Sequence, residues 1–575
     1  MPIDLLIKGA TIVDGSGGPR YRGDVAVRDG RIVDIGRITA QAADVLDADG
    51  LVLAPGFIDG HTHMDAQVAW DPLGSCSCWH GVTSVVMGNC GFALAPCRPE
   101  DREWFARCLE AVEDIPTEAM VAGIDWQWET FPQYLDAVER LPKGINYGAY
   151  IGHSALRMYV MGRRALEEEA NEDDLARMTH AVGEALEAGA FGLSTSRAST
   201  HVTPEGTPVA SRVASWTELE RLAGVLGARN AGILQLGPDV SGGEAHMAFL
   251  NRLRDIAIAI GRPTMFGVLS TRQGVDPLSW QAQLDYLDAA ARQGARLYGQ
   301  TTTRSINALF SFESYLPFDA LPAWSELRAL PLDQQQARLR DPQLRARLIA
   351  EESSMRPRDN VFQGGGAATT DPRRPDYANL FALQGVDWND PTVEQLSLAR
   401  GKHPVEVMID LALDNDMHQL FLQPLVNETP DDVLGMLRHP RTLATFSDSG
   451  AHVCQEMGSS LQTHLLSYWV RDRQRFTLEE AIRMITFDNA LAFDLPDRGL
   501  VRRGFAADLV LFEESAIRPC LPSVERDLPG GARRLVQKAE GIEATIVNGR
   551  VALRRGESTG VHAGRLLRAG GATRG

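Results

Sequence analysis

Short apolar segments alternate with amphipathic segments along most of the chain. After a first one that ends at His61 and His63, apolar runs of strand length cover 83–87, 145–151, 190–196, 232–236, 263–270, 295–301 and 442–446. Helical patterns lie between them, as in the charged segment 165–188. Strands that alternate with helices are typical of a parallel α/β fold. Eight such strands fit a (β/α)8 TIM barrel, in which active sites lie at the carboxyl ends of the strands.

The two ends of the chain carry a different pattern. Segments 5–13, 24–27 and 31–33 are short and β-type, and Asp29-Gly30 is a typical hairpin turn. Similar segments return at 507–512 and 542–551, around the hairpin pair Asn548-Gly549. We therefore expect both ends to form one small β-sandwich domain. Its N-terminal part is 1–54, its C-terminal part and tail are 491–575, and the barrel occupies 55–490.

A long segment separates the seventh and eighth predicted strands. Residues 305–402 are too many for a simple connection, for which loops above ~12–15 residues are already uncommon. They include an Arg- and Leu-rich helical run and a glycine-rich stretch at 363–370, which we interpret as a flexible loop. We interpret the insertion as a lid or as a contact in a homo-oligomer. The Gly- and Arg-rich tail at 564–575 is expected to be frayed.

Composition and charge narrow the class of partner. The net charge of −18, with no long basic patch, argues against nucleic acid or an anionic membrane as a partner. No apolar stretch reaches ~18 residues, and the first residues lack the pattern of a signal peptide. The seven cysteines are scattered without a CxxC motif, which favours a reducing compartment. We expect a cytoplasmic enzyme with a small-molecule substrate.

The first barrel strand ends in a His-x-His pair. Side chains of a strand alternate between its faces, so His61 and His63 point the same way and Thr62 points to the other side. Two imidazoles at a strand end can chelate one divalent cation. The alternative is two unrelated polar residues in a loop.

Two stretches carry a family resemblance. Segment 53–65 resembles the first barrel strand of the amidohydrolase superfamily, and segment 81–91 is similar to its D-aminoacylase (N-acyl-D-amino-acid deacylase) branch. In that branch a cysteine on the second strand is a metal ligand, which implies this role for Cys90; the alternative is a buried structural thiol. The family order also favours 295–301 as the seventh strand, and it places the ninth strand candidate, 419–422, outside the barrel.

The eighth strand brings a carboxylate to the same place. In a closed barrel strand eight lies beside strand one, so Asp448 is expected beside His61, His63 and Cys90. These N, S and O donors suit Zn²⁺, which lowers the pKa of a bound water to ~7. The resemblance implies that Asp448 is both a metal ligand and the catalytic residue that accepts the proton of that water and passes it to the leaving amine. Alternatively, Asp448 is a helix cap or turn residue.

The chain departs from the branch at three strands. Strands five and six lack the family's histidine ligands, since Gln235 and Gly267 occupy those regions, and strand four has no lysine to carboxylate. We therefore expect a single zinc ion rather than a binuclear centre. His153 or His452 could supply a further donor, or a histidine there could hydrogen-bond the substrate.

Three side chains are candidates for substrate binding: His153, Arg157 and Arg304. A guanidinium at the barrel mouth can bind a carboxylate through two hydrogen bonds, although most arginines in an Arg-rich chain are solvated.

The resemblance implies a metal-dependent hydrolase of C–N bonds other than peptide bonds, most simply an N-acyl-(D-)amino acid deacylase. One alternative is an enzyme of the same fold that acts on a cyclic amide, an ester or another bond. The other is a metal-poor homologue without catalysis, which the missing histidines suggest.

Overall fold

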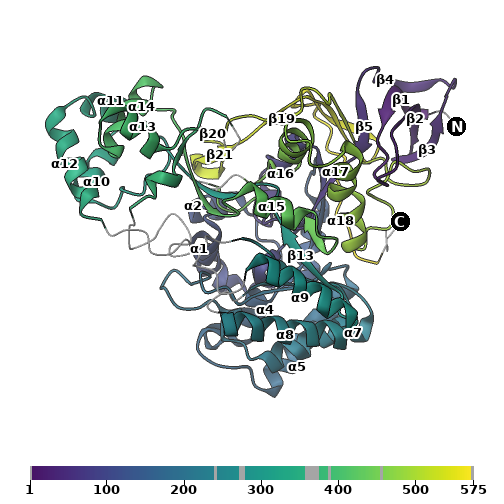
Figure 1. Cartoon of the computed structure of the whole chain (residues 1–575). Helices are drawn as coiled ribbons and strands as arrows, with labels where there is room; N and C mark the ends of the chain where they lie inside the picture. The colour runs from purple at the N-terminus through teal and green to yellow at the C-terminus, as the bar shows by residue number, and fades with distance from the viewer. Residues whose placement is uncertain are drawn as a thin grey trace.

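The computed structural model describes most of the 575 residues. The described ranges are 3–238, 243–270, 279–355, 374–385, 390–453 and 458–570. A barrel of parallel strands forms the centre, as Figure 1 shows, with the β domain and the insertion on opposite sides of it. No helix within the described ranges is both long and apolar enough to cross a membrane.

The strands of the barrel follow one another in chain order. Two parallel sheets build it: β6-β7-β8 and β9-β10-β11-β12-β13-β17. Their bounds are β6 Phe57–Asp59, β7 Val82–Met87, β8 Asn146–Ala149, β9 Ile151–Gly152, β10 Gly192–Ser196, β11 Ile233–Gly237, β12 Thr264–Gly267, β13 Leu297–Thr301 and β17 Thr442–Ala444. The pieces β8 and β9 are successive halves of the third strand. A parallel bridge between Thr62 and Ser449 joins the first strand to the last, so the predicted (β/α)8 fold is confirmed.

Four predicted strands are shorter in the structure, and the fourth begins at Gly192 instead of 190. The sixth ends at Gly267 instead of 270, the seventh begins at Leu297 instead of 295, and the eighth ends at Ala444 instead of 446. Val268 and Phe446 continue the apolar run beyond the ladder: Val268 is fully buried, and the ring of Phe446 packs on His61. An apolar run therefore marks burial here and not the end of the strand.

Amphipathic helices cover the outside of the barrel. They include α5 Glu172–Glu187, α7 Trp216–Arg229, α8 Gly243–Ile260, α9 Trp280–Arg292, α15 Pro430–Leu437 and α17 Leu478–Ile485. Sequence signals fix where they begin: Asn171 and Thr477 form capping boxes, in which each side chain accepts a bond from the third helical N–H. Their apolar faces join the strands in one large core.

Both ends of the chain contribute to one β domain, as predicted. Its sheet contains β1 Ile3–Ile12, β2 Tyr21–Arg28, β3 Arg31–Gly36, β4 Ala42–Asp47, β5 Val52–Pro55, β18 Leu509–Phe512, β23 Ile542–Val547, β24 Arg550–Arg554 and β25 Glu557–Ser558. The two ends meet where β5 pairs with β18 in antiparallel register. Asn548 and Gly549 both have positive φ, as a type I′ hairpin turn requires.

The insertion is a folded unit with its own core. An antiparallel sheet of β14 Ile306–Phe310, β15 Phe381–Ala382 and β16 Phe421–Val426 packs with α10 Pro322–Arg328, α11 Leu332–Arg338, α12 Pro342–Ser353, α13 Val393–Arg400 and α14 Pro404–Asp414. The ninth strand candidate begins β16, outside the barrel as predicted. The predicted loop 363–370 lies outside the described residues.

The tail up to residue 570 is not frayed, contrary to our expectation. Leu566 forms a parallel bridge with Tyr147 of β8, and Leu567 N–H donates to Tyr147 O at 2.7 Å. Arg568 forms ion pairs with Asp136 and Glu139 of helix α3 Phe131–Arg140. The composition of the tail does not predict these contacts, because they depend largely on backbone pairing and not on side-chain type.

Candidate metal centre

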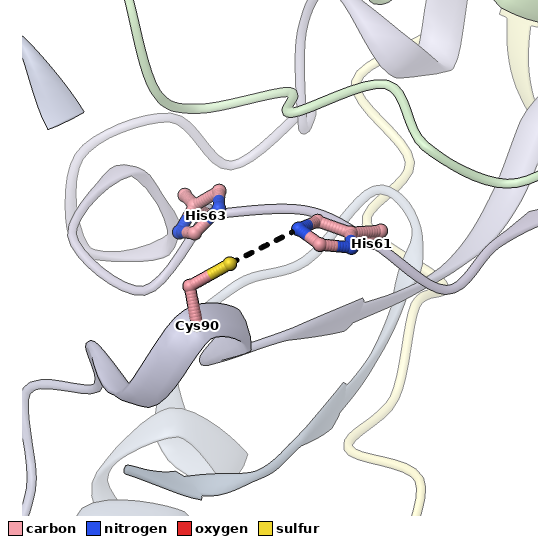
Figure 2. Close-up of side chains that lie close together, drawn as sticks. All are labelled: His61, His63 and Cys90. Carbon is pink, nitrogen blue, oxygen red and sulfur yellow. Dashed lines mark hydrogen bonds between the residues drawn. The ribbon is translucent and has the colours of Figure 1, made fainter. Parts of the chain in front are cut away.

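The two predicted histidines lie where the first barrel strand ends. His61 and His63 follow β6 and are both buried, with 1% and 4% of their surface exposed. Thr62 points the other way and donates its hydroxyl to Val86 O at 2.9 Å. Figure 2 shows both imidazoles facing the thiol of Cys90. The alternation of side chains along the strand therefore places both rings on the inner face.

Cys90 reaches the histidines through a tight turn after β7. Gly88, Cys90 and Gly91 all have positive φ, and a Cβ on Gly91 would lie 3.2 Å from Thr195 Cα. This turn aims the thiol at the barrel axis. Cys90 Sγ lies 3.5 Å from His61 Nε2, and one ligand atom each from His61, His63 and Cys90 lie within 4.8 Å of one another.

Asp448 lies beside these three donors and contacts both imidazoles. Its Oδ1 lies 3.3 Å from His61 Nε2 and 3.4 Å from His63 Nε2. A tetrahedral zinc ion with bonds of about 2.0–2.3 Å separates its ligand atoms by about 3.3–3.8 Å. The separations of Cys90 Sγ from His61 Nε2, and of Asp448 Oδ1 from both imidazoles, are those of ligand pairs on one such ion. His61, His63 and Cys90 are buried, whereas the side chain of Asp448 is 17% exposed.

A second set of side chains orients the two imidazoles. His61 Nδ1 lies 3.0 Å from Gln300 Oε1, and His63 Nδ1 lies 3.3 Å from Glu113 Oε1. The Gln300 acceptor holds the proton of His61 on Nδ1 and leaves its Nε2 for a metal, whereas Glu113 faces His63 as a charge partner. Glu113 comes from the end of α1 Arg102–Glu113 and was missed by the sequence analysis. An acidic residue on an amphipathic helix gives no signal of an inward role.

The two histidines keep the Asp448 carboxylate ionised. Burial lowers the pKa of His61 to about 4. Burial alone would raise the pKa of Asp448, but the hydrogen bond from His63 and the charges of both histidines lower it to about 2. Burial also disfavours a charged His63, yet Glu113 and Asp448 outweigh it and raise the pKa of that imidazole. A divalent cation would take the place of the proton on His63.

Other residues occupy the regions where strand five and strand six lack histidines. Gln235 Oε1 accepts the Cys90 N–H at 2.7 Å. A Cβ on Gly267 would lie 3.2 Å from the ring of Phe446, which packs on His61 with ring centroids 4.0 Å apart. These contacts fill the space beside the four donors.

Two of the predicted substrate-binding residues lie in an internal network. His153 Nδ1 is 2.8 Å from Thr195 Oγ1 and its Nε2 is 2.8 Å from Glu218 Oε1. Arg157 is fully buried and also pairs with Glu218. The hydrogen bonds that we find for both side chains are internal, and a contact with substrate stays a prediction for them.

Arg304 lies in a different setting. It follows β13, is 6% exposed and donates Nη1–H to Ser460 Oγ at 2.9 Å. It forms no ion pair with a carboxylate among the described residues. Burial lowers its pKa to about 10. Arg304 and Asp448 line the same small cavity at the barrel mouth, which we name the strand-seven cavity.

Two further histidines lie near the donors. His452 Nε2 is 3.9 Å from Glu113 Oε2. His201 Nδ1 is 2.7 Å from Ser196 Oγ, and its ring meets the ring of Phe92 edge-on at 5.2 Å. Burial, and then the charge on His63, lower the pKa of His201 to about 3. His201 was missed because a histidine in a loop after a strand carries no periodic signal.

Residues 44–553 match the model of a family described as the amidohydrolase family. An N-acyl-D-glutamate deacylase of Alcaligenes xylosoxydans xylosoxydans is 30% identical, over 95% of this chain and 93% of the relative. Two solved structures share the fold at 22% identity, with 99% of this chain and 100% of the other covered. One is an N-acyl-D-glutamate deacylase of Bordetella bronchiseptica with zinc and a phosphonate inhibitor (TM-score 0.64). The other, from a study of the binuclear metal centre, is a D-aminoacylase (TM-score 0.65).

Proposed function

The chain belongs to the amidohydrolase family, and from this premise we propose that it is a zinc-dependent deacylase of N-acyl-D-amino acids. One observation carries the proposal: three buried donors from strands one and two, His61, His63 and Cys90, converge, and Asp448 from strand eight lies 3.3 Å and 3.4 Å from Nε2 of the two imidazoles. The preference for D-amino acids is supported by the named relatives alone. The six described cysteines are free thiols, which supports a reducing, cytoplasmic compartment.

The donor set determines what a metal would contribute. A zinc ion held by His61, His63, Cys90 and Asp448 supplies water activation at neutral pH and polarises the amide carbonyl. Gln300 keeps His61 in the tautomer that binds through Nε2, and the carboxylate of Glu113 faces Nδ1 of His63. We propose one ion, since Gln235 and Phe446 fill the neighbouring space.

Asp448 is the proton carrier in this proposal. With a pKa of about 2, its carboxylate is ionised at neutral pH and can accept the proton of the attacking water on an oxygen. The same carboxylate then donates the proton to the nitrogen of the leaving amine. Asp448 therefore places the leaving group on the strand-eight side of the barrel mouth.

Arg304 supplies the contact for the carboxylate of the amino acid. A buried guanidinium without an ion-pair partner among the described residues stabilises an anion that enters beside it. Because Arg304 and Asp448 line the same cavity, we place the amino acid on this side of the donors, with its carboxylate at Arg304 and its nitrogen at Asp448.

Metal analysis and a substrate screen test the proposal together. We expect about one equivalent of zinc per chain and loss of hydrolysis on chelation, with N-acyl-D-amino acids hydrolysed faster than their L isomers and faster than cyclic amides. Preference for cyclic amides would favour the alternative enzyme of this fold. A protein that binds no metal and hydrolyses none of these compounds would favour the non-catalytic homologue.

Arg304→Gln separates the carboxylate contact from the metal chemistry. Hydrogen bonds to charged groups contribute ~1.5–3 kcal/mol, so kcat/KM for an N-acyl amino acid should fall roughly 10- to 150-fold. The rate for an N-acyl amine without the carboxylate should change little. An equal loss for both compounds would mean that Arg304 has a structural role and does not bind the carboxylate of the substrate.

A further inference from the structure

A second cavity lies at the barrel mouth, and its walls are apolar. We name it the strand-three cavity; Phe92, Phe105, Leu109, Met158 and Ala210 line it, with Trp104, Cys108, Ser154, Thr203 and Val209. It has no ionisable carboxylate, amine or guanidinium among these residues. A cavity of this kind binds an apolar group.

The strand-three cavity is adjacent to the metal donors. Phe92 follows Cys90 by two residues, and its ring meets His201 edge-on. Helix α1 connects the two places, since Phe105 and Leu109 line the cavity while Glu113 at the end of the same helix faces His63. The cavity therefore lies on the side of strands two, three and four, and Phe92 and helix α1 link its walls to the donors.

The two cavities lie on opposite sides of the donors. The strand-seven cavity is lined by residues after strands seven and eight, with Arg304 and Asp448 among them. The strand-three cavity is lined by residues after strands two, three and four. In the strand order of the barrel, the metal donors on strands one, two and eight lie between these two sets.

We propose that the strand-three cavity receives the acyl group of the substrate and selects a short, unbranched apolar chain. The argument rests on the proposed function. Asp448 protonates the leaving nitrogen, so the amino acid lies toward Arg304 and the carbonyl carbon lies at the donors. The acyl chain must then leave the carbonyl on the other side, toward Phe92.

The size of the cavity limits the chain. Its volume is about 20 Å³, whereas one water needs ~10–15 Å³ on the same measure. The space equals about one to two water-sized groups, so it admits a short chain and excludes a long one. Each buried CH₂ stabilises binding by ~0.8 kcal/mol, which corresponds to about a fourfold gain.

The test compares acyl chains on one amino acid, the D-amino acid hydrolysed fastest in the screen. We expect kcat/KM to rise about fourfold per CH₂ from N-acetyl to N-butanoyl and to fall for N-octanoyl. Calorimetric Kd values of the N-acetyl and N-butanoyl compounds on the metal-free protein give the same comparison without turnover. Equal values for both compounds in both measurements would overturn the inference.

A matched pair of methionines on one helix sharpens the test. Met158 lines the cavity, whereas Met161, also buried and three residues later on α4 His153–Met161, does not. Met158→Ala should move the preferred chain to a longer one, and Met161→Ala should leave the butanoyl-to-acetyl ratio unchanged. Ala210→Leu should lower that ratio. The same ratio in all three variants would contradict the proposal.

Failure of the proposed function gives a different result. If no N-acyl amino acid is hydrolysed but N-butanoyl binds more tightly than N-acetyl, the deacylase proposal fails and the acyl cavity stands. If hydrolysis occurs without dependence on chain length, and binding shows none, the function stands and the cavity proposal fails.

Discussion

The Oδ1 oxygen of Asp448 lies within 3.4 Å of Nε2 in both His61 and His63. At the scale of single residues, the site depends on such short separations between atoms of distant segments. Each donor also has a specific partner behind it, such as Gln300 at His61. Residue substitutions can therefore separate the donors from the groups that position them.

Asp448→Asn keeps the shape of the side chain and removes its function as a base. We expect kcat to fall by ~10²–10⁴-fold, because general acid–base catalysis contributes this much. Steady-state kinetics on an N-acyl-D-amino acid measure the effect. Asp285→Asn, at an exposed position of α9, is the control. Full turnover in Asp448→Asn would exclude the proton-carrier role.

Glu113→Gln tests whether a carboxylate behind His63 strengthens metal binding. Loss of such a partner lowers metal affinity by ~10–100-fold. Competition with a chromogenic zinc chelator measures the affinity. Glu103→Gln, exposed at the other end of α1, is the matched control. Unchanged zinc affinity in Glu113→Gln, with the control also unchanged, would limit Glu113 to a structural role.

At the scale of elements, one helix or one short segment often serves two places. Helix α1 lines the strand-three cavity with its middle and contacts His63 through its last residue. The tail 564–570 adds a short strand segment beside β8 and pairs with α3 through Arg568. Neither double role follows from the local sequence pattern.

Truncation after Ala563 tests the structural role of the tail. We expect the melting temperature to fall by several degrees, since backbone bonds to Tyr147 and two ion pairs of Arg568 are lost and ~1 kcal/mol shifts Tm by ~2–4 °C even in larger domains. Thermal unfolding followed by circular dichroism measures this. Arg555→Ala, which removes one exposed ion pair, should have little effect. Equal melting temperatures for the truncated and full chains would contradict the prediction.

At the scale of the whole molecule, buried side chains connect the barrel to segments far along the chain. His80 follows strand one, shares a 2.7 Å hydrogen bond with Thr463 Oγ1 and donates Nε2–H to Gln537 O at 3.1 Å. Burial lowers its pKa to about 3. The folded state therefore binds fewer protons than the unfolded state between about pH 3 and 6.5.

The sign of this effect predicts a loss of stability in acid. The contribution of neutral His80 is fully present above its unfolded pKa of ~6.5 and is lost as pH falls toward 3. Between pH 7 and pH 5 the loss is about 2 kcal/mol. Urea unfolding at both pH values measures it, and His80→Gln should show a smaller difference between them. If His80→Gln has the same pH dependence as the wild type, other groups cause the loss of stability in acid.

The sequence predicts the barrel and the donors for identifiable reasons. Eight apolar runs between helical patterns fix the topology, and alternation along a strand places His61 and His63 on one face. Glu113 and His201 could not be predicted, because their roles depend on how α1 and a loop fold over the mouth. The tail was predicted wrongly, since backbone pairing to Tyr147 leaves no trace in composition.

The Thr62–Ser449 bridge closes the barrel between its first and last strands. His63 N–H donates to Ser449 O at 2.8 Å and Asp448 N–H donates to His61 O at 3.2 Å, directly beside the donor atoms. An ion bound there would cross-link the first and the last barrel strands and stabilise the closed barrel. Amide hydrogens at 60–64 and 447–450 should then exchange more slowly when zinc is added, and they report cation binding without any substrate.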